Sequence, residues 1–421
     1  MKYIFLNSLP ARHNCRFLSL IFAIVGWADL AQAKEIYIQP SISLRAEYDD
    51  NKRLSTDRFS AVDTSAYGVI TRAGAKVGMR SSQYDLEVNN QLIINRYESE
   101  FDLDSEDLNL DLTAGYNFSP KSRVGLSANY TRNTTLTSEL EGDNGTGLVQ
   151  DNIIRQQWSI APNWSYSLSN TQFLQTSYTH SETTYEESVL GSFVDYTIDN
   201  ISLSFRQQWT PLFSNNISVT AMSFDIPEIG EFPFESSRET TEYSINIGAE
   251  YEISPTWSTS LTVGQRFTNT ETTQFVNTPL EQTISDDVQG LIFAFSLNKK
   301  FEAGSAELSY SRSTSAQGNG QLQVSDVMSA NYRYSYTQNL QFSIAGSLND
   351  QSTSGSEDDG NGRTSFNISP SMRWRIDRQA SLTAAYRYRK QTFESNDDEA
   401  ASNSISLNFN YQWDKIKTQR Y

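Results

Sequence analysis

Residues 404–413 read Ser-Ile-Ser-Leu-Asn-Phe-Asn-Tyr-Gln-Trp. Every odd-numbered residue of this stretch is apolar or aromatic, and every even-numbered residue is polar. Because the side chains of a β-strand alternate between two faces, the stretch predicts a strand with one apolar and one polar face. The alternation recurs through the rest of the chain with no helical stretch between, which is typical of a transmembrane β-barrel.

An export signal precedes these strands. A signal peptide needs a basic lead, an apolar core and a small-x-small cleavage pattern. The chain supplies these as Lys2 with Arg12 and Arg16, then residues 17–27, then Ala31-Gln32-Ala33. The apolar core is far shorter than the roughly 20 residues of a membrane-spanning helix. We therefore expect a signal peptide at 1–33 and a barrel at 34–421.

Composition favours the same class. The chain is 37% hydrophobic and 12% aromatic, with a mean hydropathy of −0.53. This is too polar for helices in lipid but suits a barrel, in which every second residue faces water and aromatic residues form girdles at the interfaces. The net charge of −17 argues against a nucleic acid partner. The single cysteine, Cys15, would leave with the signal, which excludes disulfides and thiol catalysis.

Short turn signals alternate with longer polar segments. The expected turns are Arg80-Ser81-Ser82, Ser119-Pro120-Lys121, Ser167-Leu168-Ser169-Asn170, residues 211–215, Ser254-Pro255-Thr256, residues 301–304, Thr337-Gln338-Asn339 and Asp377-Arg378-Gln379. Eight tight turns and nine longer loops predict an all-β, antiparallel, up-and-down barrel of about 18 strands (16–18). Tight turns are expected on the periplasmic side and long loops on the outer side. The location would be the outer membrane of a Gram-negative bacterium.

Three prolines lie inside alternating runs, at Pro40, Pro162 and Pro370. Proline cannot donate a hydrogen bond to a neighbouring strand and is normally found at sheet edges or bulges. Because a closed barrel has no edge, we expect β-bulges at these positions.

The segment Pro40-Ser-Ile42-Ser-Leu44-Arg-Ala-Glu-Tyr48-Asp49-Asp50-Asn51 resembles the start of β-barrel porins found with exopolysaccharide and exosortase (PEP-CTERM) systems. The resemblance implies an outer-membrane pore for export of a surface exopolysaccharide, with a polysaccharide export complex as a partner. It brings no catalytic motif. Other expected partners are outer-membrane lipid, lipopolysaccharide and the barrel-assembly machinery, which would contact the C-terminal strand.

The polar parity of the strands predicts the pore lining. The expected basic wall lies around the junction of the last and first strands and comprises Arg45, Arg72, Lys76, Arg333, Arg373, Arg375, Arg387 and Arg389. The expected acidic wall comprises Asp85, Glu87, Asp111, Glu242, Glu250 and Glu252. Opposed charged walls select solutes, and the basic wall could guide an anionic exopolysaccharide or a phosphate-bearing solute. The other interpretation is that these charges pair across the lumen and stiffen the barrel.

Two functions remain open at this point. One is a pore, and the other is a structural or adhesive barrel whose lumen is blocked by a loop. The longest expected loops are residues 137–150 and 225–238, and Phe224-Asp225-Ile226-Pro227 is unusually apolar for an exposed loop. A TonB-dependent receptor would need a plug of more than a hundred residues, for which the chain has no room.

Catalysis and metal binding have weak support. Beyond the signal the chain has one histidine, His180, which could pair with Ser181 or Glu182. A single histidine among many serines is not a catalytic constellation and cannot supply a transition-metal site. The segment Asp358-Asp359-Gly360-Asn361-Gly362 lacks calcium-loop spacing. We expect no enzyme activity, no cofactor and no metal site.

Overall fold

The computed structural model describes residues 35–56, 64–99, 102–136, 138, 152–186, 193–229, 235–276, 278–318, 320–353, 362–394 and 398–419. The strands in this part of the chain are β1 (Glu35–Asp49), β2 (Ala66–Arg80), β3 (Tyr84–Glu98), β4 (Ser105–Ser119), β5 (Ser122–Thr134), β6 (Ile154–Ser167), β7 (Gln172–Tyr185), β8 (Tyr196–Thr210), β9 (Phe213–Ile229), β10 (Ser236–Ser254), β11 (Trp257–Gln274), β12 (Gln282–Phe301), β13 (Gly304–Ala316), β14 (Leu322–Ser335), β15 (Leu340–Thr353), β16 (Arg363–Arg375), β17 (Ala380–Phe393), β18 (Glu399–Gln412) and β19 (Ile416–Gln419). The expected signal peptide lies outside the described residues. None of the helical residues that are described forms a segment long and apolar enough to cross a membrane.

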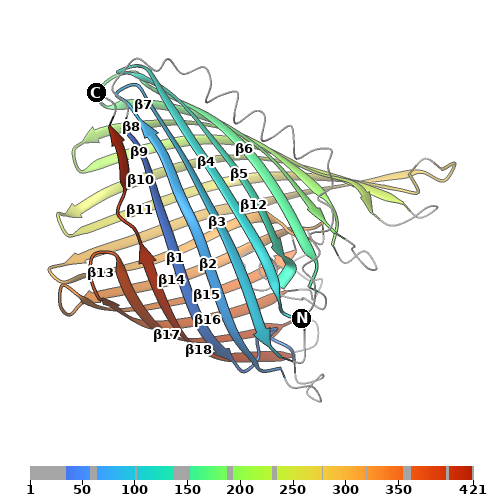
Figure 1. Ribbon diagram of the computed structural model, residues 1–421. Helices are drawn as coiled ribbons and strands as arrows, with labels where there is room; N and C mark the ends of the chain where they lie inside the picture. Colours follow the sequence, from blue (N-terminus) through green and yellow to red (C-terminus); the bar gives the residue numbers. More distant parts are fainter. Residues whose placement is uncertain are drawn as a thin grey trace.

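The strands close into a barrel (Figure 1). From β1 to β18, each strand pairs antiparallel with the next. Closure comes from β18, which pairs with β1 from Ser41–Gln412 to Asp49–Ser404. The short β19 continues along β1 beyond a break at residues 413–415. The last strand is thus in two pieces, and the barrel has 18 strands, as predicted.

The two rims differ as the turn signals indicate. At one rim, which we call the short-turn rim, two to four residues join consecutive strands. At the other, the loop rim, the connections span five to nineteen residues. Two predicted boundaries are wrong. β9 already begins at Phe213, and most of the expected loop 225–238 belongs to β9 and β10, because the strands there extend beyond the rest of the loop rim (Figure 1).

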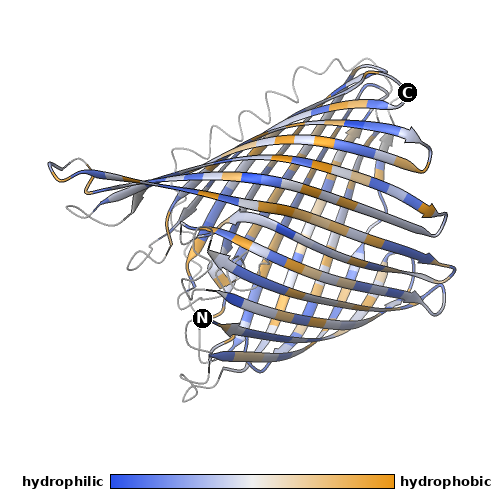
Figure 2. Cartoon of the chain, turned by 180° about the vertical axis from the view of Figure 1, so that it is seen from behind, coloured by the Kyte–Doolittle hydropathy of each residue, from blue (hydrophilic) through white to orange (hydrophobic). Residues whose placement is uncertain are grey.

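Apolar side chains face outward and are exposed, which is the reverse of a soluble protein. Ile201, Ile247 and Ile405 expose 54%, 60% and 63% of their surface. Apolar and polar residues alternate along the strands (Figure 2). Such a large continuous apolar exterior is stable only against another apolar phase. Most described strands pair on both sides along their length, and β12 lacks its β13 partner from Gln282 to Ile292, toward the loop rim. The exterior is therefore a lipid-facing belt.

Aromatic residues mark the border of this belt at the short-turn rim. Phe118, Trp209, Tyr336 and Trp374 all lie within three residues of a short turn and are exposed. This is the position of an aromatic girdle at a membrane interface. The boundary of the membrane therefore accounts for this group of aromatic residues.

The predicted proline bulges are mostly wrong. Around Pro162 and Pro370 the pairing with the following strand is interrupted for two residues and resumes in the same register. Proline removes one donor, and the sheet tolerates this gap without an extra residue. Pro40 differs, because it lies where the partner of β1 changes from β18 to β19 with a register shift of one residue. Its carbonyl accepts a hydrogen bond from the Trp413 amide at 3.1 Å.

Candidate functional site

Hydroxyl groups cover much of the lumen wall. The polar parity of the strands faces inward, and serines on neighbouring strands meet there. Four such Oγ–Oγ contacts, each 2.7 Å long, are Ser177–Ser202, Ser260–Ser296, Ser309–Ser329 and Ser343–Ser371. Each hydroxyl can both donate and accept a hydrogen bond. The wall between the charged positions is therefore neutral and hydrophilic.

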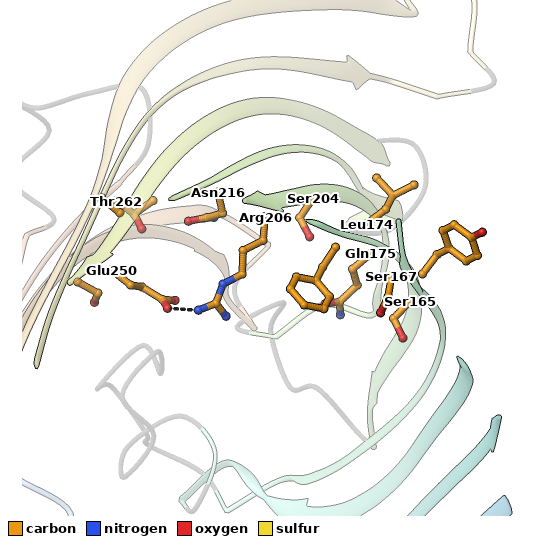
Figure 3. A pocket seen from close by; sticks show the side chains of 13 residues that line it. Ser165, Ser167, Leu174, Gln175, Ser204, Arg206, Asn216, Glu250 and Thr262 are labelled. Atoms are coloured by element: carbon orange, nitrogen blue, oxygen red, sulfur yellow. Dashed lines mark hydrogen bonds and ion pairs between the residues drawn. The ribbon is translucent and has the colours of Figure 1, made fainter. Parts of the chain in front are cut away.

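A cavity of about 550 Å³ lies against this wall near the short-turn rim (Figure 3). Cross-strand register builds one row of its lining. Phe173 of β7 is opposite Arg206 of β8, Arg206 is opposite Asn216 of β9, and the row continues through Gly248 to Thr262. Because directly paired residues share a face of the sheet, these residues all face the lumen. Gln175 and Ser204 form part of the next row.

The cavity contains one ion pair, between Arg206 and Glu250. Arg206 Nη2 lies 2.6 Å from Glu250 Oε2, and both side chains remain about half exposed. Arg206 Nη2 also donates to Ser214 Oγ at 3.0 Å. An ion pair this exposed contributes little to stability. Because both side chains keep exposed surface toward the lumen, each can also bind a further partner there (Figure 3).

Gly248 makes room for the amide in the row. A Cβ atom at this position would lie 2.2 Å from Asn216 Oδ1, closer than any real contact. The absence of a side chain at Gly248 therefore allows the Asn216 amide to lie across the wall of the cavity.

Four members of the predicted basic wall lie close to the β1–β18 junction near the loop rim. Arg45, Arg72 and Arg387 line a second, smaller cavity of about 70 Å³. Arg389 lies beside them, and its Nη2 is 3.0 Å from Oδ2 of the fully buried Asp49. Ser402 Oγ donates to the other carboxylate oxygen at 2.6 Å. The sequence prediction missed Asp49 as the acidic partner.

The β1–β2 connection contributes a second buried pair to this junction. Glu47 accepts Lys52 Nζ at 2.9 Å and the Tyr97 hydroxyl at 2.7 Å, and Arg45 Nη2 lies 2.5 Å from its other oxygen. The carbonyl of Leu54 accepts a hydrogen bond from Gln391. Residues 50–56 are therefore tied to the inside of the wall.

The remaining predicted wall residues are distributed as follows. Lys76 pairs with Glu87 at 2.9 Å, Asp85 with Arg123 at 2.6 Å, Glu242 with Arg266 at 3.6 Å and Glu250 with Arg206, while Asp111 accepts from Asn129 at 2.6 Å, and Arg333, Arg373, Arg375 and Glu252 are exposed. Acidic and basic groups thus meet on neighbouring or next-neighbouring strands and do not form two separate walls. Arg123 and Arg206, which sequence reasoning missed, lie at inward positions that the strand parity would have identified.

A buried apolar cluster, here called the mouth cluster, lies inside the loop rim. Its members are Ile153, Tyr185, Phe193, Val194, Tyr196, Phe224, Ile226 and Leu322. Phe224 and Ile226 have no exposed surface. The apolar segment around Phe224 is thus packed on the lumen face of β9. Burial also raises the pKa of the Asp195 carboxyl, which lies next to this cluster.

The mouth cluster joins two distant parts of the barrel. Beyond the pair Phe293–Arg312, toward the loop rim, β12 no longer pairs with β13. β13 itself continues to Ala316 and stays paired with β14. The connection between β13 and β14 meets the β7–β8 connection, where the Val194 amide donates to the Gly318 carbonyl at 2.9 Å. Gly320 has φ +78°, and a Cβ there would collide with Val194 and Ile226. This close approach requires glycine.

Arg238 of β10 and Arg266 of β11 contact the hairpin formed by β13 and β14. Arg238 Nη1 donates to the Gly320 carbonyl at 3.0 Å, and Arg266 Nη1 donates to Thr314 Oγ1 at 2.5 Å. A second apolar cluster, of Leu54, Ala66, Leu103, Leu136 and Ala400, lies near the β1–β18 junction. This cluster and the mouth cluster thus narrow the described part of the loop rim from two sides of the barrel.

His180 is not placed for catalysis with Ser181. Its Nδ1 lies 2.8 Å from Asp199 Oδ1, and its ring is 4.9 Å from that of Trp158. By alternation, Ser181 points to the lumen and His180 to the exterior. Within the described residues, no group of three or more His, Cys, Asp or Glu side chains could hold a metal ion.

The sequence matches no protein-family model and no curated protein. Among solved structures, the unliganded ferric citrate transporter FecA is similar with a TM-score of 0.51 at 6% identity, covering 89% of this chain and 78% of FecA. OccAB3 of Acinetobacter baumannii has a TM-score of 0.47 at 9% identity, covering 90% of this chain and 99% of that one. OpdK of Pseudomonas aeruginosa has a TM-score of 0.46 at 7% identity, covering 89% and 99%.

The similarity to FecA supports the fold. Together with the closed antiparallel sheet, the lipid-facing belt and the aromatic girdle, it identifies the chain as a β-barrel of a Gram-negative outer membrane. In such barrels the short turns are periplasmic and the longer loops face outward.

Proposed function

We propose that the protein is an outer-membrane pore for hydrophilic solutes. The observation that carries this proposal is the polar, serine-rich lumen wall with a cavity of about 550 Å³ on its periplasmic side. Barrels of 16 to 18 strands are wide enough for an aqueous channel. The narrowing at the loop rim then acts as the constriction of the pore.

The resemblance of residues 40–51 extends the proposal to saccharides. It suggests export of an exopolysaccharide through the barrel, with an export complex on the periplasmic side. A hydroxyl-lined wall is compatible with a glycan, because hydroxyl groups can exchange hydrogen bonds with a passing sugar as they do with water.

A second candidate function is an adhesive barrel with a closed lumen. The mouth cluster and the apolar cluster near the β1–β18 junction favour it, since both lie inside the loop rim. Such a barrel would act through its outer loops and would not conduct ions.

Ion selectivity tests the pore directly. Arg333, Arg373 and Arg375 lie near the periplasmic rim and are exposed. We expect the refolded barrel to conduct in a planar bilayer and to prefer anions, because exposed charges at a pore entrance attract counterions. Changing all three to glutamine should lower the anion-to-cation permeability ratio by about twofold or more and leave a conducting channel.

The matched control is Lys390→Gln, which removes a positive charge from the outward face of β17, where Lys390 pairs with Glu399 at 2.8 Å. The permeability ratio should not change in this variant. A barrel that inserts into the bilayer but conducts no more than bare lipid would favour the adhesive function instead.

A further inference from the structure

An aromatic ring faces the lumen in the periplasmic half of the barrel. Phe173 exposes 38% of its surface, and it faces inward because it is directly paired with Arg206. Its neighbour Leu174 points out of the wall (Figure 3). An exposed phenyl ring on a water-lined face has no membrane to contact, so lipid burial does not account for it.

Hydrogen-bonding groups surround this ring. Gln175, Ser204, Asn216 and Thr262 line the same cavity and point into it (Figure 3). They supply amide and hydroxyl groups that both donate and accept. Arg206 and Glu250 add one charged donor and one charged acceptor, whose charges cancel. The cavity therefore combines one apolar face with a neutral set of polar groups.

This combination matches the surface of a hexose. A pyranose ring has a face of C–H bonds, which packs on the negative face of an aromatic ring, and an edge of hydroxyls. Those hydroxyls can bond to amides, to a guanidinium and to a carboxylate. A small inorganic anion would gain nothing from the phenyl ring, whose face is negative.

The cavity continues along the wall. A neighbouring cavity of about 340 Å³ shares Arg206, Glu250 and Ser260 with the cavity around Phe173 and extends to the turn at Pro211 and Leu212. The two form a track that reaches the periplasmic rim. A track of this shape suits several units of a linear chain better than one compact ligand.

We propose that the cavity around Phe173 is a binding subsite for an uncharged, hexose-based oligosaccharide chain. Phe173 stacks on one sugar unit, and Asn216 with the Arg206–Glu250 pair binds its hydroxyls. The proposal deepens the proposed function and rests on it, because it names the class of solute that the pore would carry.

Binding of maltohexaose to the refolded barrel tests the subsite. The probe is titrated into micelle-embedded protein, and its dissociation constant is measured by saturation-transfer NMR. Phe173→Ala should weaken binding about tenfold, because loss of an aromatic contact of this kind costs roughly one factor of ten. Phe173→Trp should bind within about threefold of the unchanged protein, since the stacking face is retained.

The matched control is Gln341→Ala on β15, which removes an inward-facing amide in another part of the barrel. Its binding should equal that of the unchanged protein. A shift in gel mobility between unheated and boiled samples confirms that each variant is folded. Equal binding by Phe173→Ala, or no binding by the unchanged barrel, overturns the subsite.

The same samples separate this inference from the proposed function. Conduction in a planar bilayer without maltohexaose binding overturns the subsite and leaves the pore. Maltohexaose binding that is lost in Phe173→Ala, in a barrel that does not conduct, supports the subsite and overturns the pore.

Discussion

Replacing Asp49 by alanine is expected to lower the free energy of unfolding by about 3–5 kcal/mol, the usual cost of leaving a buried charge without its partner. Asp49 is fully buried, and its two oxygens accept hydrogen bonds from Arg389 and Ser402. The substitution would leave the Arg389 guanidinium buried beside an apolar side chain. Equilibrium unfolding in urea, with the barrel in lipid vesicles, measures the change.

Two controls identify the cause of this loss. In an Arg389→Met background, Asp49→Ala should cost clearly less, because Arg389, the more buried of the two arginines beside Asp49, is no longer left without its carboxylate. Glu399→Ala removes an exposed pair with Lys390 on β17 and β18, the strands that carry Arg389 and Ser402, and should cost less than about 1 kcal/mol. Equal costs for Asp49→Ala and Glu399→Ala would show that the buried pair does not hold the β1–β18 junction together.

Opening the mouth cluster should have the largest effect on conductance. Changing Phe224 and Ile226 together to serine removes the two fully buried side chains that pack against Leu322 and Val194. The β13–β14 connection then loses its apolar contact, and the loop-rim constriction should widen. We expect the single-channel conductance to rise about twofold or more, since access resistance falls as a constriction widens.

Loss of packing could also destabilise this barrel, so a milder change accompanies it. Ile226→Ala should raise conductance in the same direction by a smaller amount. Thr220→Ala changes another inward-facing residue of β9 outside the mouth cluster and should leave conductance unchanged. Folded variants that conduct like the unchanged barrel would show that the mouth cluster is not the constriction.

The fold could be predicted because it depends on a local property. Alternation such as that of residues 404–413 assigns each side chain to lipid or lumen, and turn residues set the strand count. The predicted bulges are absent at Pro162 and Pro370, because the missing backbone donor removes only the pairing next to it. At Pro162 and Pro370 the strands lose pairing and keep their register.

The site depends on register and on loops, which alternation does not reveal. Parity places Arg206 and Phe173 in the lumen, but only strand pairing puts them opposite each other. The prediction for the basic wall counted charges and could not anticipate that Asp49 and Lys52 would be buried among them. The segment around Phe224 is unusually apolar for an exposed loop, and the structure buries it in the mouth cluster on β9.

Thiol labelling tests the central claim that the serine-rich face is a water-filled passage. The only cysteine is Cys15, in the expected signal peptide, so single cysteines can be introduced into residues 34–421. Ser260→Cys and Ser309→Cys face the lumen, while Leu261→Cys and Leu308→Cys are their neighbours on the lipid face. The structure predicts that a small charged thiol reagent modifies the first two in the membrane and spares the other two. Protection of both lumen positions would contradict a water-filled passage.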